Sequence, residues 1–136
     1  MRILKNRAFT KAATTEGLTD EQLKGAIKEM QDGLVGDALG GSLYKKRVAE
    51  NNKGKSGGFR TIILFKDKAE YAFCLYVFPK NKKANVSSLE LKALKKLAKE
   101  YEGYTTKNIE YAIQESVFLE VQQNADVKQE TKEKKR

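Results

Sequence analysis

Two strongly apolar segments, residues 59–65 and 70–78, constrain the fold more than any other feature of this chain. They read FRTIILF and EYAFCLYVF, and both are rich in the β-branched and aromatic residues that favour strands. Apolar residues occupy both faces of each segment, which is typical of strands in the middle of a sheet that is covered on both sides. The short polar stretch between them, residues 66–69, predicts a hairpin turn.

Each apolar segment adjoins a small group of cationic and polar residues. The group at the start of the first segment contains Lys53, Lys55, the Ser56-Gly57-Gly58 stretch and Arg60. The group after the second segment contains Lys80, Asn81, Lys82, Lys83 and Asn85. If the two strands pair as an antiparallel hairpin, both groups meet at one edge of the sheet. An apolar platform with positive charge concentrated at one end is suited to binding a polyanion.

The distribution of charge supports this interpretation. The formal net charge is +9, and residues 43–83 hold eleven Lys and Arg against three Asp and Glu. Nearly all of the excess charge therefore lies on the hairpin and the strand before it. Such a concentration is typical of a surface that contacts phosphates.

The amino-acid content excludes several kinds of catalysis. The chain has no histidine and a single cysteine, Cys74, inside an apolar segment. Histidine bases, Ser–His and Cys–His pairs, His/Cys zinc sites and an intramolecular disulfide are therefore excluded, and we expect Cys74 to be a buried, inert thiol. The scarcity of carboxylates near the cations argues against a Mg²⁺ site and against hydrolysis by paired carboxylates. We expect neither a metal nor a cofactor.

Arginine and lysine around a phosphate can still cleave RNA. The 2′-hydroxyl attacks the adjacent phosphorus, and the enzyme must bear the charge that develops and protonate the leaving oxygen. Arginine suits the charge because its fork binds two oxygens and stays protonated. A lysine crowded by other cations has a lowered pKa and can exchange protons nearer neutrality. Arg60, directly after the Gly-Gly pair and phenylalanine, is the strongest single candidate.

The rest of the chain predicts one domain over residues 1–121 and a disordered polar tail over 122–136. Helices are expected at 18–33, from Ser87 to Gly103 and at 105–116, and the first two begin with capping boxes. The lysines of the second helix should face water. We expect a strand at 43–49, a loop at 34–42, a short edge strand at 2–7, a short helix at 9–15 and a last strand or flap at 117–121. The absence of a long apolar run and of a signal segment predicts a cytoplasmic protein.

Four motifs occur in succession: KKRVA from Lys45, GKSGGFRTI from residue 54, VFPKNKKANVS from residue 77 and the helix LELKALKKLAKEY. Their order and spacing resemble the RelE/HigB group of toxins from bacterial type II toxin–antitoxin modules, within the RelE/ParE superfamily. The resemblance implies an α+β fold in which N-terminal helices pack on a twisted, mainly antiparallel sheet, with a C-terminal helical segment. It also implies metal-independent cleavage of mRNA on the ribosome and a cognate antitoxin, expected to be a helix-turn-helix DNA-binding protein.

The resemblance and the cationic groups together give the expected site residues. The catalytic candidates are Arg47, Lys55, Arg60, Lys80 and Asn81. The RNA-binding candidates are Lys45, Lys46, Lys53, Lys82, Lys83 and Asn85. Several family members have a tyrosine or histidine after the last basic segment, whereas this chain has Ser87 near that position and no histidine. The general base is therefore left open.

Two other functions remain as alternatives. ParE-like relatives share the fold and inhibit DNA gyrase without cleaving RNA, but such a protein does not need cations that converge on one phosphate. A non-catalytic RNA-binding module would be favoured by exposed aromatics among the basic residues, whereas most aromatics here lie in segments that predict core strands.

Overall fold

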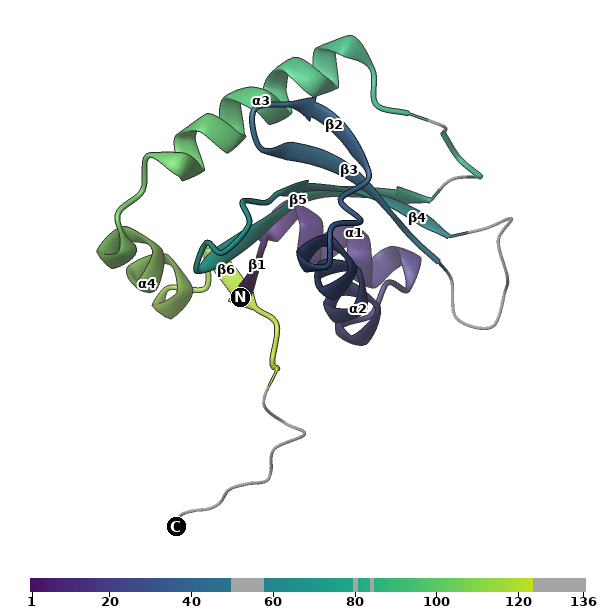
Figure 1. Ribbon diagram of the computed structural model, residues 1–136. Coiled ribbons are helices and arrows are strands. Elements are labelled where there is room, and N and C mark those ends of the chain that lie inside the picture. Colours follow the sequence, from purple (N-terminus) through teal and green to yellow (C-terminus); the bar gives the residue numbers. More distant parts are fainter. Residues whose placement is uncertain (50–57, 80, 84, 124–136) are drawn as a thin grey trace.

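The computed structural model describes residues 1–49, 58–79, 81–83 and 85–123, which form a six-stranded sheet and four helices (Figure 1). The strands are β1 (Arg2–Asn6), β2 (Asp37–Gly40), β3 (Leu43–Val48), β4 (Phe59–Leu64), β5 (Tyr71–Pro79) and β6 (Phe118–Glu120). The helices are α1 (Arg7–Glu16), α2 (Asp20–Gln31), α3 (Ser88–Glu102) and α4 (Thr106–Gln114). The predicted α+β class is confirmed.

The sheet is mostly antiparallel, with the strand order β2-β3-β4-β5-β1-β6. Among the described strands, β1 and β5 alone pair in parallel. The predicted hairpin is present, and its register places Phe59 of β4 opposite Pro79 of β5. The start of β4 therefore lies beside the end of β5, which is the arrangement that was needed to bring the two cationic groups to one edge of the sheet.

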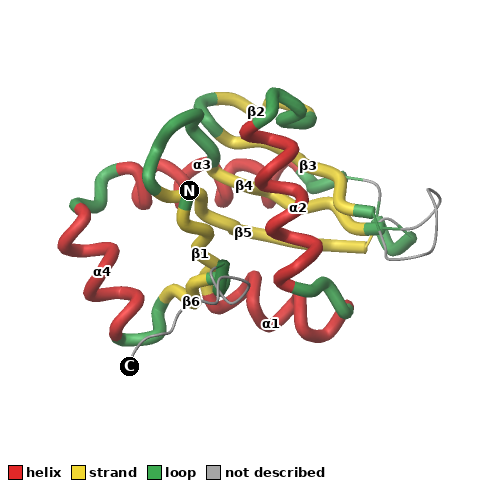
Figure 2. Tube along the Cα trace, turned by 60° about the horizontal axis from the view of Figure 1, so that its bottom comes forward, coloured by secondary structure: helices red, strands yellow, loops and turns green. Residues whose placement is uncertain are grey.

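Helices cover both faces of the sheet, as the two-sided apolar strands predict. Helices α1 and α2 pack on one face, where Phe9, Leu23 and Ile27 meet Ile63 and other strand residues. Helices α3 and α4 pack on the opposite face, here called the α3–α4 face, around a second apolar cluster. Figure 2 shows α2 in front of the sheet and α3 behind it. The N-terminal helices and the C-terminal helical segment thus agree with the expected arrangement.

The helix starts that the sequence predicts are present. Thr19 and Ser87 each begin a helix with a complete capping box, formed with Gln22 and Glu90 respectively. Such caps satisfy backbone N–H groups that have no partner inside the helix. The four lysines of α3 are exposed, as expected.

Two expectations about the edges of the sheet are wrong. Residues 37–40, expected to lie in a loop, form the edge strand β2, which pairs with β3 and packs Leu39 against the α3–α4 face. Strand β1 is not at an edge, because it lies between β5 and β6. Its Ile3 and Leu4 point to opposite faces and both are buried, because both faces of the sheet are covered there. The second neighbour of β1 is β6, so residues 118–120 form a strand.

A β-bulge in β5 determines which side chains reach the α3–α4 face. Ile62 pairs with Tyr76 while Ile63 pairs with Cys74, so Leu75 is an extra residue in the strand. Leu75 and Tyr76 consequently both contact the apolar cluster of the α3–α4 face. Beyond the bulge the alternation is reset, and Tyr76 and Phe78 share this face with rings 5.7 Å apart.

No helix among the described residues is long and apolar enough to cross a membrane. The expected tail lies outside the described residues from position 124 onward.

Gly36 gives a test of how tightly β2 is held against β3. It has a φ of +84°, and a Cβ there would collide with the backbone carbonyl of Lys45. Gly17 has a similar φ of +82° but nothing lies within 4 Å of a Cβ at that position. Gly17→Ala should therefore cost only the backbone strain, about 1–2 kcal/mol. Gly36→Ala should cost about 1–3 kcal/mol more, because residue 36 and the backbone of β3 must also move apart.

Chemical denaturation of both variants measures this difference. Equal losses of unfolding free energy in the two variants would contradict the close approach of residue 36 to β3.

Candidate functional site

Two rows of side chains cross β3, β4 and β5 on the α3–α4 face near the strand ends. In the first row, Arg47 lies opposite Arg60, which lies opposite Phe78. In the second row, Lys45 lies opposite Ile62, which lies opposite Tyr76. Directly opposite residues in antiparallel strands have Cβ atoms roughly 5 Å apart. The sheet therefore brings together cations that are separated along the sequence.

The two arginines place like charges on neighbouring positions, an arrangement that is destabilising unless an anion or acidic partner lies between them. Arg47 is exposed and Arg60 is half-buried. The Nη1 atom of Arg60 is buried and has no hydrogen-bond partner within the described part of the chain. A buried donor without a partner costs about 1–3 kcal/mol. An anion that accepted a hydrogen bond there would remove this cost, and the pair is well suited to a phosphate.

Lys83 is fixed beside this pair by an acidic and aromatic cluster. Its Nζ atom lies 2.8 Å from both carboxylate oxygens of Glu90. The same ammonium group lies 5.7 Å from the centre of the Tyr76 ring and 5.6 Å from that of Phe78, within cation–π range. The Tyr76 hydroxyl donates a hydrogen bond of 3.0 Å to Glu90. Lys83 is thus held in one place over β5, the third strand of the site.

The electrostatics of this cluster define the charge of each member. The hydrogen bond from Lys83, followed by those from the Ser87 backbone and Tyr76, lowers the pKa of Glu90 to about 2. The hydrogen bond to Glu90 in turn raises the pKa of Lys83. At neutral pH Glu90 is therefore an anion and Lys83 a cation. Neither is poised to exchange protons, so their contribution is a fixed charge and a fixed position.

Lys45 links the site to the loop before α3 and to the edge strand β2. Its Nζ atom lies 3.3 Å from the Asn85 side-chain oxygen and 3.6 Å from an Asp37 carboxylate oxygen. Asn85 also accepts a hydrogen bond of 2.9 Å from the Val86 backbone. Lys45 and Asn85, two of the expected RNA-binding residues, are therefore in contact.

The structure does not bring two of the expected RNA-binding residues to this face. Lys46 points to the α1–α2 side, where it is buried and pairs with Glu29 at 2.7 Å. This follows from the alternation of side chains along β3, in which Lys46 shares a face with Tyr44 and Val48. Lys82 pairs with Glu16 at the end of α1, at 3.3 Å.

Of the four remaining expected residues, the structure describes Asn81 alone. Asn81 is exposed in the turn after β5, and Lys53, Lys55 and Lys80 lie outside the described residues.

Sequence reasoning missed Tyr76 and Glu90 as parts of the site. In the sequence, Glu90 stands out only as the third residue of a capping box, and Tyr76 only as one residue of an apolar strand. The signal that could have found Glu90 is its spacing from Lys83, since α3 starts only a few residues after the cationic segment. No signal predicts the bulge that turns Tyr76 toward Glu90.

No group of three or more His, Cys, Asp or Glu that could hold a metal ion occurs among the described residues. Asp67 and Glu70 lie in the turn between β4 and β5, at the opposite end of the hairpin from the arginine pair. Burial raises the pKa of the Cys74 thiol strongly, so this side chain is an inert core residue.

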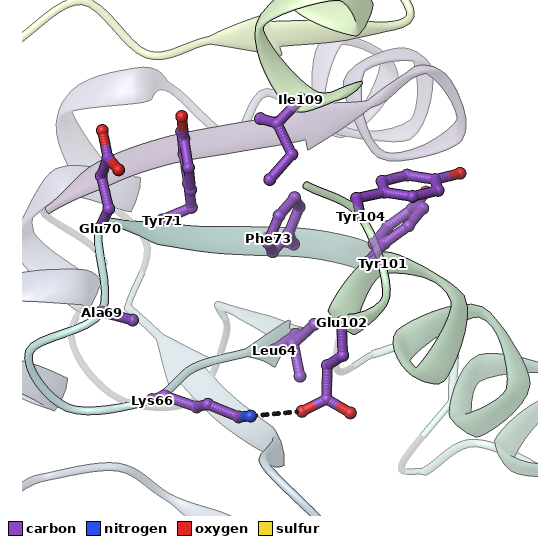
Figure 3. A pocket seen from close by; sticks show the side chains of 10 residues that line it. All are labelled: Leu64, Lys66, Ala69, Glu70, Tyr71, Phe73, Tyr101, Glu102, Tyr104 and Ile109. Carbon is purple, nitrogen blue, oxygen red and sulfur yellow. Dashed lines mark ion pairs between the residues drawn. The ribbon is translucent and has the colours of Figure 1, made fainter. Parts of the chain in front are cut away.

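A cavity of about 180 Å³ lies at that opposite end, between the β4–β5 turn and the α3–α4 connection. Figure 3 shows its aromatic lining, including Tyr71, Phe73, Tyr101 and Tyr104, and the ion pair between Lys66 and Glu102 at its rim. It shares no side chain with the arginine pair or the Lys83 cluster.

Two helical layers around a mostly antiparallel sheet, with cations gathered at one end of the central strands, define a small α+β protein with a basic sheet face. A protein-family model described as RelE toxin of RelE / RelB toxin-antitoxin system matches residues 1–121. Because this match covers most of the chain, the protein belongs to the RelE toxin family. No curated protein matches the chain at a significant level. The resemblance drawn from the motifs is confirmed: the chain is a toxin of the toxin–antitoxin type, and its family implies a cognate antitoxin.

The charge on Glu90 can be tested through the pH dependence of stability. Because its pKa is lower in the folded protein, Glu90 adds stability above its ordinary pKa of about 4.3, and this is lost as the pH falls toward 2. Glu90→Gln keeps the capping box, since glutamine serves at that position too. The variant should therefore be less stable than the wild type at pH 6, and the difference should shrink between pH 4 and pH 2.

Urea denaturation at a series of pH values measures this. Glu115→Gln is a suitable control, because it removes an exposed carboxylate without an ion pair among the described residues. A constant difference between Glu90→Gln and the wild type at all pH values would contradict the proposed pairing with Lys83.

Proposed function

We propose that this chain is a ribosome-dependent endoribonuclease that cleaves mRNA without a metal and so inhibits translation. The single observation that carries the proposal is the register that sets Arg47 opposite Arg60, with a buried guanidinium N–H that lacks a partner in the described residues. Family membership supports it, because RelE toxins are in general endoribonucleases.

The chemistry starts with attack of the ribose 2′-hydroxyl on the adjacent phosphorus. Negative charge then develops on the non-bridging oxygens of the phosphate. A pair of guanidinium groups can bind these oxygens through several N–H donors. Preorganised donors of this kind stabilise the transition state without reorganising during the reaction. The products are a 2′,3′-cyclic phosphate and a free 5′-hydroxyl.

Lys83 supplies a further fixed cation at the same end of the sheet. Its pairing with Glu90 keeps it protonated, so we assign it to phosphate binding rather than to proton transfer. Lys45 and Asn85 extend the cationic surface toward β2 and are assigned to RNA binding, together with Lys53.

The proton transfers need groups with pKa values nearer neutrality. Lys55 and Lys80 are our candidates for these proton transfers. Lys55 precedes Arg60 by five residues, and Lys80 directly follows Pro79. A lysine among many cations has a lowered pKa. Asn81 is assigned to orienting the RNA. Lys46 and Lys82 have carboxylate partners elsewhere and are given only an accessory role in RNA binding.

The partners follow from the same proposal. The ribosome presents the mRNA, and both are polyanions that a basic surface attracts. We propose that the antitoxin is a helix-turn-helix DNA-binding protein and that the complex resides in the cytoplasm.

Replacing Arg60 tests the proposal directly. In a translating extract, the wild-type protein should produce cuts in mRNA that primer extension maps. Arg60→Ala should reduce the rate of cleavage by about 10²-fold or more, the usual effect of removing one transition-state donor. Arg60→Lys should recover only part of the rate, because an ammonium group cannot reproduce the guanidinium fork.

Lys28→Ala is the matched control, since it removes one positive charge from α2, which packs on the opposite face of the sheet from the arginine pair, and breaks only a surface pair of 3.7 Å. Intact mRNA in the presence of ribosomes and wild-type protein would reject the nuclease function. Full cleavage by Arg60→Ala would instead reject the site while leaving the function standing.

A further inference from the structure

A second cavity on the α3–α4 face lies between α3 and the turn that joins β2 to β3. Its volume is about 280 Å³, larger than the aromatic cavity at the end of the hairpin. Leu43, Leu64 and Ala98 form its apolar floor. Lys95 and Lys99 of α3 lie on one side, and the Gly40-Gly41-Ser42 turn lies on the other. We call this the turn cavity.

The turn is shaped so that a lysine can reach it. Gly40 has a φ of +112° and Gly41 a φ of +61°, conformations that glycine adopts readily. A Cβ on Gly40 would lie 3.2 Å from the Nζ atom of Lys95. The missing side chain at Gly40 thus leaves room for the ammonium group against the backbone of the turn. The Ser42 carbonyl accepts a hydrogen bond of 2.9 Å from the Phe65 backbone, which fixes the turn to β4.

Among the residues that the structure describes, the cations of the turn cavity have no acidic partners. Within the described residues, neither Lys95 nor Lys99 forms an ion pair, and the Ser42 hydroxyl forms no hydrogen bond. Like charges four residues apart on a helix repel each other. The one carboxylate among the described lining residues, Glu102, pairs with Lys66 at 3.0 Å (Figure 3). An anion between the two lysines would relieve their repulsion and find a hydroxyl donor nearby.

The turn cavity lies on the same face of the sheet as the arginine pair. Leu43 at its floor, Lys45 and Arg47 are alternate residues of β3, so their side chains share one face. At about 3.3 Å per residue, Leu43 and Arg47 are roughly 13 Å apart along the strand. Lys45 lies between them on the same face, with its Nζ atom near the side-chain oxygens of Asn85 and Asp37.

We propose that the turn cavity binds a backbone phosphate of the RNA strand whose scissile phosphate lies at Arg47 and Arg60. Its volume is slightly below the usual range for whole small-molecule ligands, so it fits a phosphate with part of a sugar. This inference rests on the proposed function for the identity of the strand. It adds a second contact that holds the RNA along β3, away from the reacting atoms.

An RNA that cannot be cleaved separates binding from catalysis. The probe is a single-stranded RNA oligonucleotide with 2′-O-methyl groups at every position, which lacks the attacking hydroxyl. Its affinity is measured by fluorescence anisotropy at several salt concentrations, for the full chain. Lys95→Gln combined with Lys99→Gln should weaken binding about 3- to 10-fold at low salt. Loss of one phosphate contact should also reduce the salt slope by about 0.7.

Lys92→Gln combined with Lys96→Gln is the matched control. It removes the same charge from the same helix at the same spacing, and neither residue lines the turn cavity. The control should leave the affinity and the salt slope close to wild type. Equal losses in both double variants would overturn the proposal, because they would reflect diffuse charge on α3. No loss in either would overturn it as well.

Backbone amide spectra locate the contact and identify the ligand. The amide signals of Gly40, Gly41 and Ser42 should shift on addition of the oligonucleotide, and the shift should vanish in the Lys95/Lys99 double variant. Inorganic phosphate and a nucleoside monophosphate should give these shifts only at far higher concentration. If either small anion binds as tightly as the oligonucleotide, the RNA assignment is overturned in favour of a free-anion site.

One further result would reject the RNA assignment. If the Lys95/Lys99 double variant binds RNA normally but loses affinity for an acidic peptide, the turn cavity serves a protein partner. Because the probe cannot be cut, none of these outcomes depends on nuclease activity. Failure of the proposed cleavage and failure of the turn cavity are therefore distinguishable.

Discussion

The antiparallel pairing of β4 with β5 is the interaction on which the rest of the structure depends. Both strands carry apolar residues on both faces, so each face must be covered, and the two helical layers follow from that need. The same register brings Phe59 beside Pro79 and Arg60 beside Phe78. The pairing thus builds the core and assembles the cationic end of the sheet at once.

The cations on the α3–α4 face differ in whether they have an acidic partner. Lys83 is held by Glu90 and Lys45 lies near Asp37 and Asn85, so these ammonium groups have fixed positions. The Nη1 atom of Arg60 has no partner within the described residues, and its burial makes that costly. Fixed cations around an unsatisfied donor are what a phosphate site requires, since the donors need not reorganise when the ligand arrives.

Helix α3 joins the two parts of this surface. Its first turn supplies Glu90, which positions Lys83 and Tyr76, while Lys95 and Lys99 reach the β2–β3 turn further along the helix. The capping box at Ser87 and the buried face that includes Leu94 and Ala98 fix the helix on the sheet. A single element therefore sets the geometry at the arginine pair and at the turn cavity.

The sequence by itself determined the central hairpin, the capped helices and the gathering of cations at one end, because each follows from local patterns of apolar residues, caps and charge. It also determined, through the alternation of β3, that Lys45 and Arg47 share a face while Lys46 does not. Tertiary structure alone decided the place of β1 between β5 and β6, the pairing of residues 37–40 as β2, and the bulge at Leu75 that turns Tyr76 toward Glu90. These features depend on contacts between segments far apart in the chain, and no local pattern encodes which distant partner a strand or a charge will meet.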